Sequence, residues 1–283
     1  MRSYPLLLLP AALAVTCLAQ TAEQAPYSSA TISGLGARNI GSASGGVWKS
    51  EDGGTRYKPV FDEQPVQSIG AVALDPKNAK NVWIGTGESW TRNSVSIGDG
   101  MYKSTDGGDT WTHVGLKDSE RISQIVVDPN SGDTVYAAVP GRLWSDSDER
   151  GLYKTTDGGK SWNKVLKGSN SSTGCSAVAM DPTNPNIILA GLWDFRRQGW
   201  TFRSGGDGPE AESGSGLFRS ADGGATWTEL TPENSKGFPK KPYGRIAVAI
   251  APSNAKRVYA FVEGTDSALF VSDDGGATWD KRD

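Results

Sequence analysis

The chain has 283 residues, with 32 acidic residues against 29 basic ones and a formal net charge of −3. This slightly acidic balance, without a basic block, argues against nucleic acid or an anionic membrane as a partner. The single histidine, His113, almost excludes His-based catalytic triads and His-rich metal sites, so we expect no metal and no cofactor. The 36 glycines and 10 tryptophans are typical of a β domain with short strands and many turns.

The N-terminus has the features of a secretory signal. Arg2 precedes the apolar run 5–15, which is too short to span a membrane. We expect a signal peptide over 1–19 and a linker with a partial strand over 20–45, which predicts a secreted, periplasmic or extracellular protein. Lipidation at Cys17 is disfavoured because Thr16 stands where lipoprotein signals prefer Gly or Ala. Cleavage would leave Cys175 without a disulfide partner, as a buried strand thiol.

An eight-residue unit of the form Ser-x-Asp-x-Gly-x-Thr-Trp recurs along the chain. Its copies are 104–111, 155–162, 220–227 and 272–279, with a worn copy at 50–57. Asp and Ser side chains can bond nearby backbone N–H groups, and the Gly pair permits positive φ, so the unit predicts a tight hairpin turn. We therefore expect structural roles for its aspartates, which are Asp52, Asp106, Asp157, Asp222 and Asp274.

A second repeated phrase comes before each complete unit. It consists of an apolar run, a turn that usually contains Asp-Pro, and another apolar run, as in 71–76 followed by 82–85. This pattern predicts a hairpin buried on both faces. Together with the outer hairpin it gives four strands in about 50 residues, which is the spacing of a propeller blade.

The repeats predict an all-β fold, a β-propeller of four-stranded antiparallel blades over residues 46–283. The expected blades are 46–61 (partial), 67–115, 121–166, 175–231 and 244–282. About four and a half blades form an incomplete ring, and open edges invite aggregation. We therefore expect a fragment of a longer chain whose missing blades complete the ring.

Strand parity divides the loops between two ends of the strands. The Asp-Pro turns and the eight-residue units share one end, and the long, irregular connections share the other, where function usually resides. Those connections supply candidate ligand-binding residues. They are Trp90, Arg92, Arg142, Trp144, Trp193, Arg196, Arg197 and Trp200. These rings and charges could stack on sugar or hold an extended peptide. Equally, the tryptophans could wedge between blades while the charges pair locally.

Two smaller motifs are weaker. Residues 146–151 begin like a calcium loop but place Arg150 where a ligand oxygen belongs, which disfavours calcium. Residues 170–172 form a glycosylation sequon, which matters only in a eukaryotic secretory route.

The eight-residue unit resembles the Asp-box, or bacterial neuraminidase repeat (BNR). With the phrases at 45–50, 85–88, 121–122 and 151–154, the chain resembles the secreted bacterial propellers of the sortilin (VPS10-like) N-terminal type, which are often labelled glycosyl hydrolases. The resemblance implies that each box lies on a hairpin between the two outer strands of a blade and is structural.

Two function classes remain open. The favoured one is a binding module for protein, peptide or glycan, because a scaffold does not determine chemistry. The alternative is a glycoside hydrolase similar to the Asp-box xyloglucanases, which needs two carboxylates about 5–9.5 Å apart. The candidates are Glu88, Asp99, Asp148, Glu149, Asp194 and Glu263. A sialidase is disfavoured because the Phe-Arg-Ile-Pro motif is absent.

Overall fold

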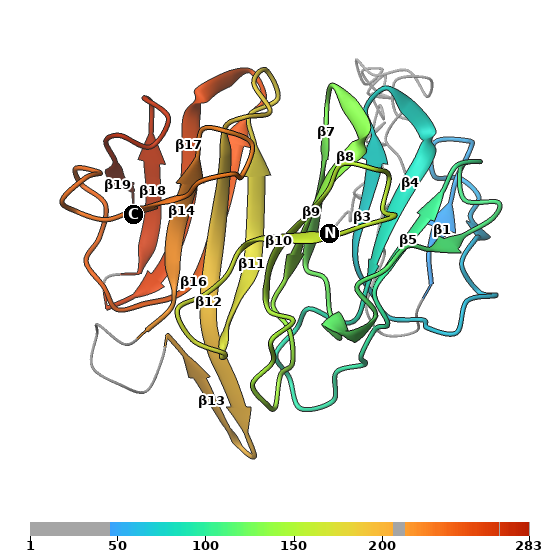
Figure 1. Ribbon diagram of the computed structural model, residues 1–283, viewed down its shortest axis with the longest axis horizontal. Helices are drawn as coiled ribbons and strands as arrows, with labels where there is room; N and C mark the ends of the chain where they lie inside the picture. The colour runs from blue at the N-terminus through green and yellow to red at the C-terminus, as the bar shows by residue number, and fades with distance from the viewer. Residues whose placement is uncertain (1–45, 206–212, 266, 283) are drawn as a thin grey trace, which may run out of the picture.

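The computed structural model describes residues 46–205, 213–265 and 267–282 (Figure 1). These residues form an all-β structure of antiparallel sheets, with one 3₁₀ turn, η1 (Lys117–Ser119). The expected signal peptide, the lipidation candidate Cys17 and the linker over 20–45 lie outside the described residues.

Three sheets of four strands and one of five follow a two-stranded sheet along the described chain. The small sheet pairs β1 (Trp48–Lys49) with β2 (Lys58–Pro59). Sheet 1 contains β3 (Ile69–Asp75), β4 (Asn78–Thr86), β5 (Met101–Ser104) and β6 (Thr112–His113). Sheet 2 contains β7 (Gln124–Asp128), β8 (Ser131–Val139), β9 (Gly151–Thr155) and β10 (Asn163–Leu166).

Sheets 3 and 4 repeat this meander. Sheet 3 contains β11 (Thr173–Met180), β12 (Ile188–Gln198), β14 (Gly216–Ser220) and β15 (Thr228–Leu230), and β13 (Thr201–Ser204) pairs with the end of β12. Sheet 4 contains β16 (Tyr243–Ala251), β17 (Asn254–Gly264), β18 (Ala268–Ser272) and β19 (Asp280–Arg282). Strands β11 and β16 begin slightly before the expected starts of their blades at 175 and 244. The division of the chain into blades stays a prediction.

The hydrophobic core lies between consecutive sheets, because both faces of the inner strands are apolar. All of β11 is buried, for example. Tyr136, Ala138 and Leu152 of sheet 2 pack in one cluster with Val178 and Ile188 of sheet 3. Each sheet therefore depends on its neighbours for burial of its apolar faces.

Each full Asp-box closes the turn between the third and fourth strands of its sheet, and the worn box joins β1 to β2. In the first full copy the Ser104 hydroxyl donates to Asp106 Oδ1 (2.7 Å) and accepts from the Gly108 N–H (2.8 Å). The Thr110 N–H and hydroxyl donate to the same carboxylate at 2.9 and 2.6 Å. Gly107 and Gly108 have φ of 80° and 95°, a conformation that favours glycine. The carboxylate thus ties both ends of the turn together.

Each full box also bonds to the hairpin formed by the first two strands of its own sheet, at or just before the start of the second strand. The Gly107 N–H donates to Lys80 O at 2.8 Å, and Gly158 donates to Asp133 O at 3.1 Å. The corresponding bonds in sheets 3 and 4 join Gly223 to Asn186 and Gly275 to Lys256. Boxes and inner turns therefore share one end of the strands, which we call the box face, as strand parity predicts.

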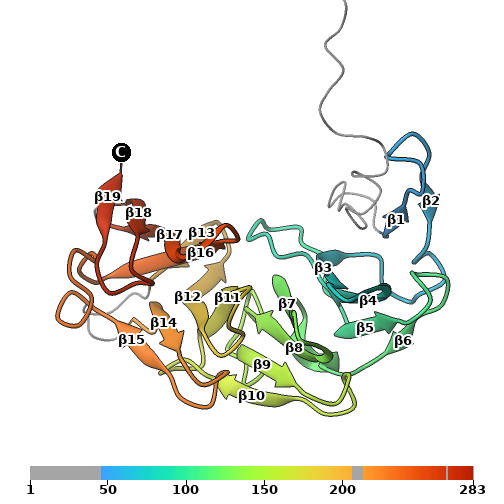
Figure 2. The same cartoon turned by 90° about the horizontal axis from the view of Figure 1, so that it is seen from above.

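The sheets follow one another around an arc (Figure 2). The first strands of neighbouring sheets contact each other in the order β3, β7, β11, β16. This is the arrangement of consecutive propeller blades. Closure of the ring and the number of blades in it stay predictions.

Candidate functional site

The end of the strands opposite the box face carries the connections β4–β5 and β8–β9, the β12–β13 hairpin and the β17–β18 turn. We call this end the loop face. The β12–β13 hairpin projects beyond the other elements there (Figure 1). It is held as a regular ladder, from Phe195 paired with Ser204 to Gln198 paired with Thr201. The long, tryptophan-rich connections of three neighbouring sheets thus lie at one end of the molecule.

An aromatic cluster joins these connections. Trp193 stacks on Phe195 with ring centroids 4.4 Å apart, and Phe202 packs edge-on against Trp193 at 5.6 Å. Leu143 from the β8–β9 connection and Val95 from the β4–β5 connection complete it. Trp193 is only 4% exposed and its Nε1 donates to the Ser204 hydroxyl at 2.8 Å. Its buried position fits the interpretation that it wedges between blades. Neither face of the ring is open for a ligand to stack on.

Three other tryptophans of the loop face are open to solvent. Trp90, Trp144 and Trp200 are 64%, 48% and 94% exposed, and they come from three different connections. Trp200 stands at the tip of the β12–β13 hairpin, beside Gly199 with φ of 51°. Large exposed rings are suited to stacking on a sugar or to anchoring a peptide. Of the expected ligand-binding aromatics, these three remain available.

The expected ligand-binding arginines are largely engaged by neighbouring groups. Arg92 donates to the Glu88 carboxylate at 2.7 Å, and Arg197 Nε donates to Asn93 Oδ1 at 2.5 Å. Arg196 forms an ion pair with Asp146. Arg142 lies 3.7 Å from Glu120. These contacts hold the connections against one another. The positive charges of the four arginines are therefore already paired with groups of the same chain.

Arg150 occupies the turn that begins like a calcium loop. Its guanidinium donates to the carbonyl oxygens of Pro140, Arg142 and Ser145. It also lies over the Phe195 ring, 4.4 Å from the centroid. Burial and the nearby Arg121 charge lower the pKa of Arg150 to about 10. The arginine thereby places a positive charge among carbonyl oxygens of the β8–β9 connection.

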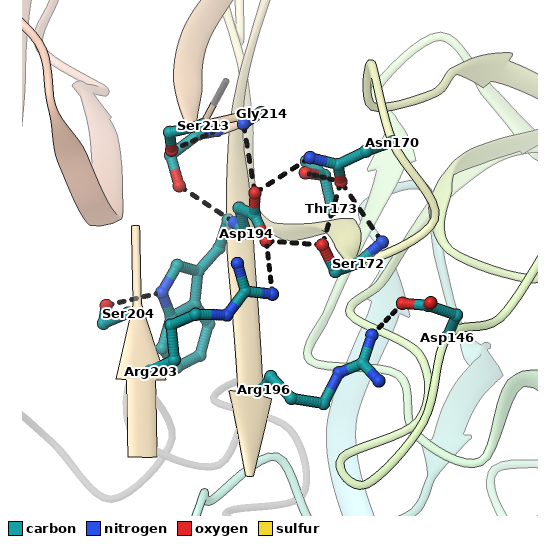
Figure 3. A network of polar contacts seen from close by, with 12 residues as sticks. Asp146, Asn170, Ser172, Thr173, Asp194, Arg196, Arg203, Ser204, Ser213 and Gly214 are labelled. Atoms are coloured by element: carbon teal, nitrogen blue, oxygen red, sulfur yellow. Dashed lines mark hydrogen bonds and ion pairs between the residues drawn. The ribbon is translucent and has the colours of Figure 1, made fainter. Parts of the chain in front are cut away.

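Asp194 is the centre of a buried polar network (Figure 3). Its carboxylate is 1% exposed and accepts from the Ser172 hydroxyl (2.7 Å), Asn170 Nδ2 (2.9 Å) and the Gly214 N–H (3.2 Å). Arg203 pairs with it at 3.2 Å. The network ties β12 and β13 to the segments before β11 and β14. Because its carboxylate is enclosed by these partners, Asp194 has a structural role: it holds these segments together.

The remaining candidate carboxylates differ in exposure. Glu88 is 2% exposed and is held by Arg92. Asp99 accepts from the Tyr102 hydroxyl at 2.7 Å, and burial together with this bond raises the pKa of Tyr102. Glu263 accepts from the Ser204 hydroxyl at 2.8 Å and the Arg245 N–H at 2.7 Å. Asp148 is exposed and Glu149 is partly buried. A catalytic pair among these residues stays a prediction.

Sequence reasoning missed the supporting residues Asn170, Ser172 and Arg203. The sequon contained a usable signal, because Asn-x-Ser before a buried strand can also cap a turn. Asn170 Oδ1 accepts from the Ser172 N–H and hydroxyl and from the Thr173 hydroxyl. A glycan on Asn170 would cost the bond to Asp194.

Neither a metal site nor a membrane span emerges from the described ranges. Residues 46–205, 213–265 and 267–282 contain no cluster of three or more His, Cys, Asp or Glu side chains that could hold an ion. No helix within those same ranges is long and apolar enough to cross a membrane.

The family comparisons match two parts of the chain. The family model described as "Sortilin, neurotensin receptor 3" matches residues 45–167, and the BNR/Asp-box repeat model matches residues 270–281. The chain resembles these Asp-box propellers, as the repeated boxes suggested.

The curated relatives that match the chain are named xyloglucanases. A xyloglucanase from Paenibacillus sp is 27% identical over 195 residues, covering 63% of this chain and 17% of the relative. A probable oligoxyloglucan-reducing end-specific xyloglucanase from Neosartorya fischeri is 26% identical over 275 residues, covering 86% and 31%. The chain thus spans less than a third of the length of these relatives.

The crystal structure of a GH74 enzyme from Niastella koreensis superposes with a TM-score of 0.55 and 24% identity, covering 83% of this chain and 34% of that one. An ancestral GH74 enzyme gives a TM-score of 0.53 at 21% identity, covering 86% and 25%. These likenesses establish a shared propeller-like fold. The names of the relatives favour the hydrolase alternative over the binding module.

Proposed function

We propose that this chain is part of a secreted glycoside hydrolase of the xyloglucanase type, and that its loop face binds a β-glucan chain. The observation that carries the proposal is the set of three exposed indoles, Trp90, Trp144 and Trp200, on connections of three neighbouring sheets. A polysaccharide lying across the loop face could stack a sugar on each of these rings in turn.

The xyloglucanase names of the relatives supply the substrate class. Hydrolysis would require two carboxylates on opposite sides of the scissile bond. Glu88 and Asp194 are enclosed by their own partners, so Asp99, Asp148, Glu149 and Glu263 are the better candidates. Further blades of a longer chain would extend the binding surface and could supply one member of the pair.

Affinity electrophoresis in gels containing xyloglucan tests the binding step. We expect xyloglucan to retard the full chain, and Trp200→Ala to relieve that retardation at unchanged mobility in a plain gel. Tyr57→Ala, which changes an exposed aromatic residue of the worn box and not of the loop face, is the matched control. Equal retardation of all three proteins would contradict a role for Trp200.

Release of reducing ends from xyloglucan tests the chemical step. Retardation together with release supports the hydrolase. Retardation without release by the longer protein, with its further blades present, would favour the second candidate, a binding module, which the local pairing of the loop-face arginines also fits.

A further inference from the structure

Every Asp-box places a glycine directly after its aspartate. The boxes therefore contain five Asp-Gly pairs, which are 52–53, 106–107, 157–158, 222–223 and 274–275. An aspartate followed by glycine is chemically vulnerable, because no side chain shields the glycine nitrogen and the glycine backbone turns freely. The reaction in question is isomerisation of the aspartate, and the fixed geometry of each box decides whether it can proceed.

The isomerisation has two steps and uses only water. In the first, the backbone nitrogen of the glycine attacks the side-chain carboxyl carbon of the aspartate. A C–N bond forms, the nitrogen gives up its proton, and the protonated carboxyl oxygen leaves as water, so that a five-membered succinimide ring results. In the second step one water molecule adds to either ring carbonyl and opens the ring to aspartate or to isoaspartate.

The four full boxes oppose the first step with two hydrogen bonds. The hydroxyls of their Thr or Ser donate to the second carboxylate oxygen at 2.5–2.6 Å. A donor to that oxygen favours the ionised carboxylate, whereas loss of water needs the protonated one. The attacking nitrogen is also engaged, since the Gly107 N–H donates to Lys80 O at 2.8 Å and the other full boxes have the same bond.

The worn box lacks the hydroxyl bond because of its own sequence. Arg56 takes the place of the Thr or Ser, and Asp52 accepts only through Oδ1, from the Ser50 hydroxyl and from the N–H groups of Thr55 and Arg56. Among the described residues none donates to Oδ2 of Asp52. This difference is local, because the residues that decide it lie within one eight-residue turn.

We propose that Asp52 is a site of spontaneous isomerisation, at which isoaspartate forms faster than at the aspartates of the full boxes. Isoaspartate carries the main chain through its Cβ, so the turn between β1 and β2 gains one backbone atom. The N–H groups of Thr55 and Arg56 then lose the carboxylate position that they now share. This inference does not depend on the function proposed for the loop face.

Peptide mapping of the full 283-residue chain, aged for weeks in neutral buffer, tests the proposal. Endoproteinase Asp-N cuts before aspartate but not before isoaspartate, and mass spectrometry counts the uncut junctions. We expect isoaspartate at Asp52 to exceed that at each full box at least about fivefold, the factor that one hydrogen bond contributes. Asp52→Glu should abolish the signal, because the longer side chain does not close a five-membered ring.

Two reciprocal variants isolate the hydroxyl. Arg56→Thr gives the worn box the missing donor and should slow isomerisation at Asp52 about fivefold. Thr110→Val removes the donor from the first full box at nearly constant volume and should raise isoaspartate at Asp106 by a similar factor.

Two results would overturn the proposal. Equal isoaspartate at Asp52 and at the four full boxes would mean that the worn box is no weaker a barrier to the reaction. Unchanged rates at Asp52 in Arg56→Thr, together with unchanged rates at Asp106 in Thr110→Val, would mean that the hydroxyl bond does not control it.

Discussion

The box face and the loop face satisfy their polar groups in different ways. At the box face each turn is closed by a carboxylate, two hydroxyls and backbone N–H groups from within eight residues of the chain. At the loop face, Arg197 reaches Asn93 across 104 positions and Arg196 reaches Asp146 across 50. Local closure makes the box face repetitive, whereas long-range closure makes each loop-face residue depend on one particular neighbour.

The largest expected effect comes from a comparison of two tryptophans of the loop face. Trp193→Ala should cost about 3–5 kcal/mol of unfolding free energy, because it empties a buried stack on Phe195. Trp200→Ala should leave the unfolding free energy almost unchanged, since the ring is 94% exposed. Urea denaturation of both variants measures this, and equal losses would contradict the division into support and exposed rings.

Removal of a buried carboxylate should have the next largest effect. Asp194→Ala should cost about 3 kcal/mol, because Arg203 and Asn170 lose a buried partner. Asp146→Ala is the matched control. It breaks a pair whose carboxylate side is 56% exposed, which is worth about 0–1 kcal/mol. A similar loss in both variants would mean that the Asp194 network is not the anchor of the hairpin.

The box face could be derived from the sequence far better than the loop face. Ser104, Asp106 and Thr110 lie within one turn, and their spacing alone specifies the bonds that they make. The burial of Trp193 and the exposure of Trp200 could not be told apart, because burial depends on Leu143 and Val95 from other sheets. The enclosure of Asp194 likewise depends on residues 20 to 24 positions away.

Acid should weaken the box face. The hydroxyl and N–H of Thr226, with the Ser220 hydroxyl, lower the pKa of Asp222 to about 2. A carboxyl whose pKa is depressed on folding stabilises the protein above its unfolded pKa, and that contribution is lost as the pH falls. We expect the melting temperature to drop between about pH 4 and pH 2.

Asp222→Asn provides the control for this titration. The variant should be less stable than the wild type at pH 7, and the difference should shrink as the pH approaches 2. A constant difference across this range would show that the acid sensitivity comes from other groups.

The smallest effect is expected at the worn box. Asp52 Oδ1 accepts from the Ser50 hydroxyl and from the N–H groups of Thr55 and Arg56. Arg56 stands where the full copies have Thr or Ser. The worn box therefore lacks the hydroxyl that donates to the second carboxylate oxygen in the full copies. Asp52→Asn should therefore lower the melting temperature less than Asp157→Asn, whose carboxylate also accepts from the Ser161 hydroxyl at 2.6 Å. Thermal unfolding of the two variants measures the contribution of that one bond. An equal or larger fall in melting temperature for Asp52→Asn would mean that the hydroxyl adds little to the closure of the turn.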